Sequence, residues 1–263
     1  MNVETMMNVQ ADFIRNSVKE GKRLDGRKLD EFRKIEIEKG LIPNAEGSCR
    51  VRMGNTHVIA GIKMGVAKPF SDKPDDGILI SNAELAPMAA ARFEPGRPSE
   101  DAVETARVID RGIRESKSIE TDKLCIEKGE KVWMVNVDVQ VMNHDGNLID
   151  AGGLAAAIAL ANCKIPKYDP ETDTVDISER KEKLPFKLKP IPVTIFKIGG
   201  KLVLDPTLEE EDVADARLTV STMDNGHVTA LQKSGPGSFS TGEIQEAIAM
   251  SVKKGKELRK LVE

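Results

Sequence analysis

The sequence predicts an α+β fold made of two similar halves, each a set of antiparallel strands followed by a long helix. Three observations predict it. Apolar residues alternate strictly over 133–141, as in a strand with one buried face. Two helix starts carry a capping serine, Ser99 in the first half and Ser240 in the second. With 263 residues, 40% of them apolar, the chain is long enough for one large domain or two small ones.

In the first half, the sequence predicts further strands and helices before and after the long strand over 133–141. Gly54-Asn55 separates two apolar runs and suits a tight two-residue hairpin turn. Pro87 interrupts a run that is helical in composition. The elements expected here are a helix over 11–20, strands over 50–53, 56–64 and 78–80, a helical run over 83–92, a helix over 99–116, the strand over 133–141, and a helix over 154–161 that is apolar on all sides and hence buried.

The second half is predicted to contain two hairpins and a closing helix. The hairpins pair 193–198 with 201–204 and 217–222 with 228–232, and the helix follows Ser240. The charged, proline-punctuated stretch that starts at Lys164 is interpreted as a linker. The predicted organisation is an N-terminal helix and arm over 1–30, a first half over 31–165, a linker over 166–190 and a second half over 191–263.

The composition argues against a chain that attracts nucleic acid over its whole surface. The formal net charge is −4, so any contact with RNA must come from a local cluster of arginines. Aromatic residues make up only 3% of the chain, which argues against a base-stacking platform. No apolar run reaches the roughly 18 residues of a membrane span, and the first residues lack a signal sequence, so we expect a cytoplasmic protein.

The cysteines and histidines form no pattern typical of a disulfide framework or a metal site. Cys49, Cys125 and Cys163 stand far apart in the sequence and are interpreted as buried thiols. Each of the three histidines lacks a second ligand nearby. We therefore expect neither a metal nor another cofactor.

Three arginines share one face of the helix predicted over 99–116. At about 100° per residue, Arg107, Arg111 and Arg114 fall in one arc, centred roughly 130° from the apolar arc of the same helix. The apolar face can therefore dock on a sheet while the three guanidiniums point elsewhere together. A guanidinium grips phosphate with two hydrogen bonds, so three along a helix could track a single-stranded backbone. The alternative is a solvated face that pairs with neighbouring acids, namely Glu100, Glu104 or Asp110.

Three longer motifs resemble those of a known family. The runs 21–27 (GKRLDGR), 40–56 and 106–116 are similar to RNase PH-like exosome subunits, particularly the non-catalytic archaeal type, and the resemblance covers nearly the whole chain. It implies an RNase PH fold (ribosomal protein S5 domain 2-like) with two pseudo-repeated β-sheet-plus-helix halves. It also implies a catalytically inactive, structural subunit that shapes the active site of its partner.

The resemblance further implies partners. Subunits of this type alternate with a catalytic RNase PH-like subunit in a hexameric ring, together with RNA-binding cap subunits, and the complex degrades single-stranded RNA from 3' to 5'. In this family the non-catalytic subunit is understood to lend the arginines matching Arg107, Arg111 and Arg114 to the RNA path. Arg92 and Arg97 are weaker candidates for the same role.

The resemblance also identifies where catalytic acids would lie. Active members carry two aspartates six residues apart, and the matching positions here are Glu211 and Arg217. A guanidinium neither accepts a proton near neutral pH nor binds a cation, so this pair cannot transfer protons as two carboxylates do. Asp212 and Asp215 lie close by, and a shifted alignment could recruit them. An active phosphorolytic exoribonuclease therefore stays an alternative.

The phosphate site of active members is altered as well. Those members have a Gly-Thr-Arg or Gly-Ser-Arg run, whereas this chain has Leu148 and Ile149 where the hydroxyl and the guanidinium would be. Asp150 is expected to add a negative charge where inorganic phosphate would bind, so the anion loses donors and gains repulsion. A second alternative is a purely structural ring protein whose arginines make salt bridges and do not contact RNA.

Overall fold

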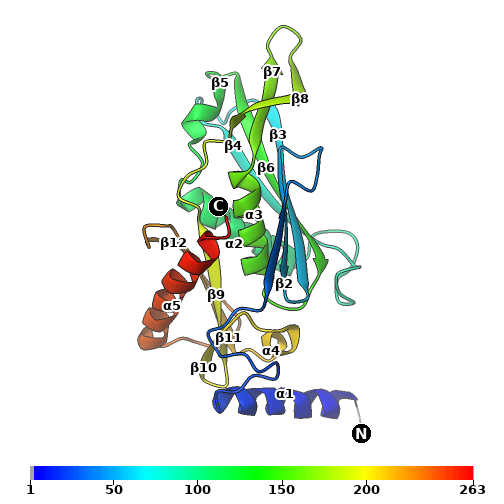
Figure 1. The fold of residues 1–263 in the computed structure, drawn as a ribbon, viewed down its shortest axis with the longest axis vertical. Helices are drawn as coiled ribbons and strands as arrows, with labels where there is room; N and C mark the ends of the chain where they lie inside the picture. The colour runs from blue at the N-terminus through cyan, green and yellow to red at the C-terminus, as the bar shows by residue number, and fades with distance from the viewer. Residues whose placement is uncertain (1–2, 263) are drawn as a thin grey trace.

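The computed structural model describes residues 3–262, which form an elongated molecule with α1 at one end of its long axis and a two-stranded hairpin at the other (Figure 1). The helices are α1 (Val3–Lys19), α2 (Glu100–Glu115), α3 (Leu148–Ala161), α4 (Leu208–Asp212) and α5 (Thr241–Arg259), with a 3-10 helix, η1, at Thr121–Leu124. The strands are β1 (Ile35–Lys39), β2 (Gly47–Met53), β3 (Thr56–Ala67), β4 (Ile78–Leu85), β5 (Cys125–Glu127), β6 (Lys131–Asn143), β7 (Lys164–Asp169), β8 (Thr174–Lys183), β9 (Ile191–Ile198), β10 (Lys201–Leu204), β11 (Ala216–Thr222) and β12 (Val228–Ser234). The predicted α+β class is confirmed.

The larger sheet belongs to the first half and has the strand order β1-β2-β3-β6-β4, with β5 paired to β6. Met53 pairs with Thr56, so Gly54 and Asn55 form the predicted hairpin turn. β4 runs parallel to β6, and the prediction of antiparallel strands alone is wrong for this pair. Parallel neighbours need a crossover, and here α2 and η1 lie between the two strands in the chain.

The smaller sheet belongs to the second half and has the order β10-β9-β11-β12, with every pair antiparallel. Both predicted hairpins of this half are therefore confirmed. α5 contacts β9 and β11, and α3 contacts β9. A helix of each half thus packs on the central strands of this sheet.

α3 lies at the centre of the molecule, where it contacts β2, β3 and β6 of the larger sheet and β9 of the smaller one (Figure 1). Every residue from Leu148 to Leu160 is buried, which explains why the helix is apolar on all sides. Gly153 allows the closest approach, because a Cβ there would lie 2.2 Å from Cγ of Pro192. α3 therefore joins the two halves through one continuous core.

Three predicted helices differ from the structure. The helix predicted over 11–20 begins eight residues earlier, at Val3. The run 83–92 is not helical: residues 83–85 continue β4, and loop follows. Residues 83–85 favour a helix by composition, but pairing of β4 with β6 outweighs this preference. In that pairing Ala83 lies opposite Val139. The helix predicted over 154–161 begins six residues earlier, at Leu148. Gly152 and Gly153 are weak helix formers, and burial of the whole segment outweighs that preference.

Two predicted helix starts are confirmed. The hydroxyl of Ser99 accepts a hydrogen bond from the N–H of Ala102 at 3.2 Å and caps α2. Ser240 and Glu243 form a reciprocal capping box at the start of α5. Both caps act within one turn of chain, so the local sequence was sufficient to predict them.

The stretch 166–190, interpreted as a linker, is largely folded. β7 and β8 pair as an antiparallel hairpin that projects from the end of the molecule opposite α1 (Figure 1). Its strands are mostly charged, and its pairing has register shifts around Pro166. The sequence pattern lacked clear alternation because few of these side chains meet the core. The stretch predicted as a linker therefore contains a hairpin that the sequence analysis did not predict.

Candidate functional site

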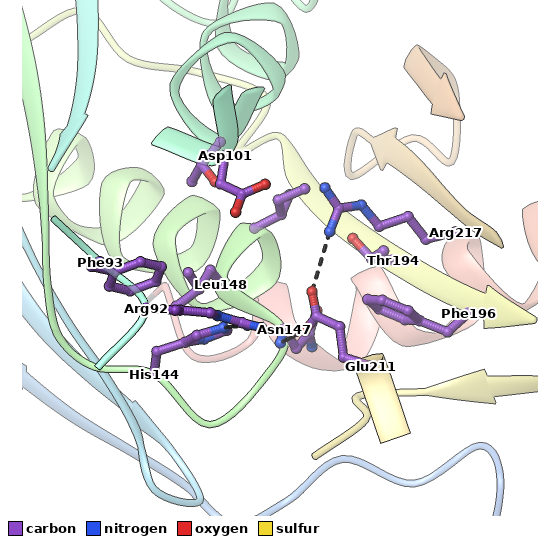
Figure 2. Close-up of a pocket in the computed structure, with 12 residues that line it drawn as sticks. Arg92, Phe93, Asp101, His144, Asn147, Leu148, Thr194, Phe196, Glu211 and Arg217 are labelled. Atoms are coloured by element: carbon purple, nitrogen blue, oxygen red, sulfur yellow. Dashed lines mark hydrogen bonds and ion pairs between the residues drawn. The ribbon is translucent and has the colours of Figure 1, made fainter. Parts of the chain in front are cut away.

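The positions predicted as degenerate catalytic residues meet in a small cavity between the two halves of the molecule. The cavity has a volume of about 50 Å³ and is lined by the start of α3, by α2 and β9, and by the segment from α4 to β11 (Figure 2). We call it the α3 cavity. Among its lining residues are Asn147, Leu148, Ile149, Glu211 and Arg217. The sequence reasoning therefore identified residues that the fold brings together.

Glu211 and Arg217 form an ion pair (Figure 2). Nη1 of Arg217 lies 3.2 Å from Oε1 of Glu211, and Nη2 lies 2.5 Å from Oε2 of Glu104 on α2. Glu104 also accepts a hydrogen bond from the hydroxyl of Ser234. The guanidinium of Arg217 is thus shared between two carboxylates. The Glu211–Arg217 pair therefore contributes one carboxylate to the cavity, which Asp101 of α2 also lines.

The segment that carries Glu211 is held by the N-terminal arm. The side chains of Arg23 and Glu210 are almost fully buried and form two hydrogen bonds, at 2.9 and 2.5 Å. Arg33 binds Asp205 of the second half and Asp145 of the first. The motif over 21–27 and the residues that follow it therefore fix α4 against the start of α3.

The alternative acids, Asp212 and Asp215, are engaged elsewhere and do not line the α3 cavity. The carboxylate of Asp212 pairs with Nη1 of Arg92 at 2.8 Å, and more than half of its side chain is exposed. Asp215 accepts a hydrogen bond from the N–H of Gly199 at 3.2 Å, at the turn between β9 and β10. Neither acid faces Glu211 across the cavity, so the shifted alignment gains no support from the geometry.

Leu148 and Ile149 occupy the first turn of α3 and are buried with apolar side chains against the cavity. The N-cap residue, Asn147, has a left-handed conformation (φ 58°), and its side chain does not cap the helix. Its backbone N–H instead donates to Oε2 of Glu211 at 2.7 Å. A carboxylate of the chain itself thus lies at the positive end of α3. Burial raises the pKa of Glu211, while the Asn147 N–H and Arg217 act in the opposite direction.

The expectation that Asp150 faces the phosphate position is wrong. Its side chain is completely buried and accepts hydrogen bonds from the N–H and the hydroxyl of Thr194, at 3.0 and 2.7 Å, and from the amide of Asn147 at 3.2 Å. Burial raises the pKa of Asp150 to about 7. A helix turns successive side chains by about 100°, which directs Asp150 away from the cavity that Leu148 and Ile149 line.

Arg92 and His144 close one side of the α3 cavity (Figure 2). A guanidinium nitrogen of Arg92 contacts Nε2 of His144, whose ring stacks on Phe93 with 5.4 Å between centroids. Burial, and then the positive charge of Arg92, lowers the pKa of His144 to about 4, so the imidazole is neutral at pH 7. The sequence analysis assigned no role to His144. Its partners, Arg92 and Phe93, lie in a loop, and the position of a loop cannot be predicted from helical or strand periodicity.

The structure separates the three predicted arginines of α2. Arg107 is exposed and Arg111 half-buried, and both line a groove of about 360 Å³ between α2 and β12. Nη1 of Arg111 lies 3.4 Å from Oε1 of Gln232. Arg114 turns toward β4, where it donates to both carboxylate oxygens of Asp110 at 2.8 Å and to the carbonyl of Leu79 at 2.9 Å. Arg107 and Arg111 thus form one group, whereas Arg114 already has partners within the chain.

Arg97 is exposed in the loop between β4 and α2 and lines a larger groove together with Arg92. That groove also contains the carboxylates of Glu84, Glu94 and Asp138. Acids therefore offset the two arginines, and the groove as a whole is not a basic surface.

Residues 3–262 contain no group of three or more His, Cys, Asp and Glu side chains arranged to hold a metal ion. All three cysteines are free; Cys49 and Cys163 are buried, whereas Cys125 is partly exposed. Within the same described range, no helix combines the length and apolar character needed to cross a membrane.

Comparison with known proteins gives concordant matches over both halves. The model of domain 1 of the 3' exoribonuclease family (RNase PH) matches residues 31–166, and that of domain 2 matches residues 190–254. The protein named exosome complex component Rrp42 from Thermococcus gammatolerans is 51% identical over 263 residues, covering 99% of this chain and 96% of its own length. The Pyrococcus furiosus protein of the same name is 48% identical, covering 99% of this chain and 95% of its own. Among solved structures, a chain of the Archaeoglobus fulgidus exosome with RNA bound to the active site superposes with a TM-score of 0.91 at 41% identity, covering 98% of this chain and 100% of that one.

Proposed function

Because the chain belongs to the 3' exoribonuclease family, we propose that it is a non-catalytic subunit of an exosome ring that degrades RNA from 3' to 5'. Relatives that match over nearly their whole length are named exosome components, which supports this assignment to a complex. The proposed ring is cytoplasmic and contains no cofactor bound by this subunit.

One observation carries the non-catalytic part of the proposal, the ion pair between Glu211 and Arg217. By the family resemblance, Arg217 occupies the position of the second acid of active members. Its guanidinium forms ion pairs with both Glu104 and Glu211. A guanidinium cannot serve as a general base at neutral pH. The apolar side chains of Leu148 and Ile149 at the start of α3 add no donor for a substrate anion.

The proposed partner is a catalytic RNase PH-like subunit, which alternates with this chain in a hexameric ring covered by RNA-binding cap subunits. Sheet edges support such an assembly: β1 and β4 end the larger sheet, and β10 and β12 end the smaller one. Unpaired strand edges favour pairing or cover by another chain. In this reading residues 31–165 and 191–263 are the two halves that face neighbouring subunits, and residues 1–30 form the arm.

The proposed contact with single-stranded RNA rests mainly on Arg107 and Arg111. Both line the same groove, which Glu100 and Glu104 also line, and neither guanidinium forms an ion pair among the described residues, so both can donate to phosphates. Arg114 is part of the same proposal, but its hydrogen bonds to Asp110 must be given up or shared for it to bind RNA. We therefore expect Arg114 to contribute less than Arg107 or Arg111.

The decisive experiment compares three preparations: the full-length chain alone, a catalytic homologue alone, and the two together. Each is incubated with single-stranded RNA and inorganic phosphate, and release of nucleoside diphosphates is measured. We expect no release by this chain alone and robust release by the assembled pair. Size-exclusion chromatography with light scattering on the same samples reports whether a ring forms.

Release of nucleoside diphosphates by this chain alone would overturn the non-catalytic assignment. A double variant, Asp212→Asn with Asp215→Asn, then distinguishes an activity of this chain from a contaminant. If the variant loses the release, the alternative of an active phosphorolytic exoribonuclease is correct. If this chain stays a stable, soluble monomer when it is mixed with the catalytic homologue, that result contradicts the proposed ring.

A further inference from the structure

We propose that Arg217 is a positioning residue for the groove between α2 and β12. It holds the carboxylate of Glu104 away from Arg107 and thereby keeps the Arg107 guanidinium free for an RNA phosphate. The inference rests on the RNA contact proposed above and extends it to a residue that does not itself line the groove.

The sequence places Glu104 where it would pair with Arg107. The two residues lie three apart on α2, and side chains at this spacing are neighbours on the helix surface, where opposite charges form ion pairs. The same helix contains such a pair further along: Arg114 donates to Asp110, four residues before it, at 2.8 Å. An arginine bound in this way must give up or share its carboxylate before it can bind a phosphate.

The structure shows that Glu104 has other partners. Its Oε2 lies 2.5 Å from Nη2 of Arg217, and its Oε1 accepts a hydrogen bond from the hydroxyl of Ser234. Arg217 lies directly opposite Ser234 in the pairing of β11 with β12, so their side chains share one face of the smaller sheet and meet at Glu104. Both oxygens of this carboxylate are therefore bound by the second half. Arg107 is exposed on the groove and forms no ion pair among residues 3–262.

Arg217 also offsets the negative charge of the groove. Glu100 and Glu104 line it together with the guanidiniums of Arg107 and Arg111. The carboxylate of Glu104 repels a nearby phosphate, and a cation bound to that carboxylate weakens the repulsion. Glu100 lies about two turns before Arg107 on α2, so the two are not neighbours at the spacing that favours pairing. Glu104 is therefore the acid that the groove needs to have bound elsewhere.

Direct contact of Arg217 with RNA is the competing explanation for any effect of this residue. Arg217 lines the α3 cavity and not the groove (Figure 2), and its guanidinium is bound to the carboxylates of Glu104 and Glu211. The two explanations differ in what happens when Glu104 loses its charge. In our proposal Arg217 then becomes dispensable for RNA binding, whereas a direct contact would still be needed. A double variant therefore separates them.

The test is RNA binding by the ring assembled from this chain and the catalytic homologue. It is measured by fluorescence anisotropy with labelled single-stranded RNA, without inorganic phosphate, so that the RNA is not phosphorolysed. Arg217→Met should weaken binding by roughly threefold to tenfold, because the released Glu104 carboxylate pairs with Arg107 and repels the RNA. Adding Glu104→Gln should restore the affinity to within about twofold of the ring with Glu104→Gln alone. Raising the salt concentration should shrink the loss, because the effect is electrostatic.

Glu100→Gln is the matched control, because it removes an acid of the same groove that Arg217 does not bind. It should change the affinity by the same factor with and without Arg217→Met. Arg217→Gln covers the case in which Arg217→Met does not fold, since its amide can still donate a hydrogen bond to Glu104 but carries no charge. Its ring should also lose affinity and regain it when Glu104→Gln is added.

Assembled rings with Arg217→Met or Arg217→Gln that bind RNA as tightly as wild type would overturn the proposal. A loss that Glu104→Gln does not restore would overturn it as well, and would point to direct contact or a change in fold. Arg107→Glu with Arg111→Glu tests the RNA groove itself. If that ring binds as wild type does, the proposed RNA contact fails. If it loses affinity while the Arg217 variants do not, the contact stands and only the role of Arg217 fails.

Discussion

Arg23 and Glu210 form a doubly hydrogen-bonded ion pair across 187 residues of sequence, with almost no exposed side-chain surface on either partner. The same guanidinium donates to the carbonyls of Leu204 and Asp205. The pair therefore anchors the N-terminal arm to α4 and fixes the backbone next to Glu211. A feature of the first 30 residues thus determines the geometry of a site built from residues near position 211.

This pair predicts a large loss of stability on truncation. Arg23→Ala should lower the free energy of unfolding by about 3–5 kcal/mol, because it leaves the carboxylate of Glu210 buried without its cation. Urea denaturation measures the change. Lys22→Ala is the control, since the neighbouring ion pair of Lys22 with Glu20 is exposed and should contribute little. A loss no larger than that of the control would contradict the anchoring role.

Asp150 predicts a specific pH dependence of stability. Burial raises the pKa of Asp150 from its ordinary value of 3.8, which applies to the unfolded chain, to about 7 in the folded chain. Between pH 3.8 and about pH 7 the folded chain therefore binds one more proton than the unfolded chain. Stability attributable to this group therefore falls as pH rises from about 4 to about 7. Asp150→Asn should remove that dependence, so its stability relative to wild type should increase between pH 5 and pH 8. Thermal unfolding at three pH values measures it.

The hydrogen-bond pattern explains why asparagine is the correct replacement. Oδ2 of Asp150 accepts two N–H donors, whereas Oδ1 meets only the Thr194 hydroxyl, which can accept from an N–H₂ group and donate to Thr219 in turn. Asp150→Ala serves as the contrast, because it leaves Thr194 and Asn147 without partners and should destabilise the chain at every pH. Parallel curves for wild type and Asp150→Asn would show that Asp150 does not titrate in this range.

The shared guanidinium of Arg217 predicts coupling to Glu104. Arg217→Met should destabilise the chain by about 1–3 kcal/mol, because it leaves two partly buried carboxylates without their cation. Combining it with Glu104→Gln should recover part of the loss, and a double-mutant cycle in urea measures the coupling. Additive losses would show that the two side chains do not interact in solution.

The groove between α2 and β12 predicts how RNA binding responds to salt. Arg107→Glu with Arg111→Glu, placed in the assembled ring, should weaken RNA binding and reduce the slope of log K against log salt by about 1.4, or about 0.7 for each lost phosphate contact. Fluorescence anisotropy with labelled single-stranded RNA measures this. Lys253→Glu with Lys256→Glu on α5 is the charge-matched control, because both lysines are exposed on a helix away from the groove. Equal slopes for all three rings would favour the purely structural role of the arginines.

Arg114 provides an internal comparison for the same measurement. Arg114→Glu loses its ion pair with Asp110 and gains a like-charge neighbour, so its effect on stability should exceed its effect on RNA affinity. We expect a smaller change in RNA affinity than for Arg107→Glu alone. A larger change would mean that Arg114 leaves Asp110 to bind RNA.

The sequence by itself determined the α+β class, the two-residue turn at Gly54, both helix caps and the long strand through Val137. Each of these depends on groups within a few residues of one another, so periodicity and local hydrogen bonding are sufficient. The strand through Ala83 and the hairpin formed by β7 and β8 over 164–183 could not be predicted in this way. Their structure depends on pairing partners that the local pattern does not identify.

For the site, the sequence identified Glu211, Arg217, Leu148 and Ile149 through their match to family motifs, and the fold gathers all four around one cavity. Only the tertiary structure decided that Asp150 is turned away and that the Glu211 carboxylate lies at the start of α3. It also decided that Arg114 is already paired. Which group a side chain faces depends on how segments far apart in the chain pack together, and helical or strand spacing fixes direction only relative to the element itself.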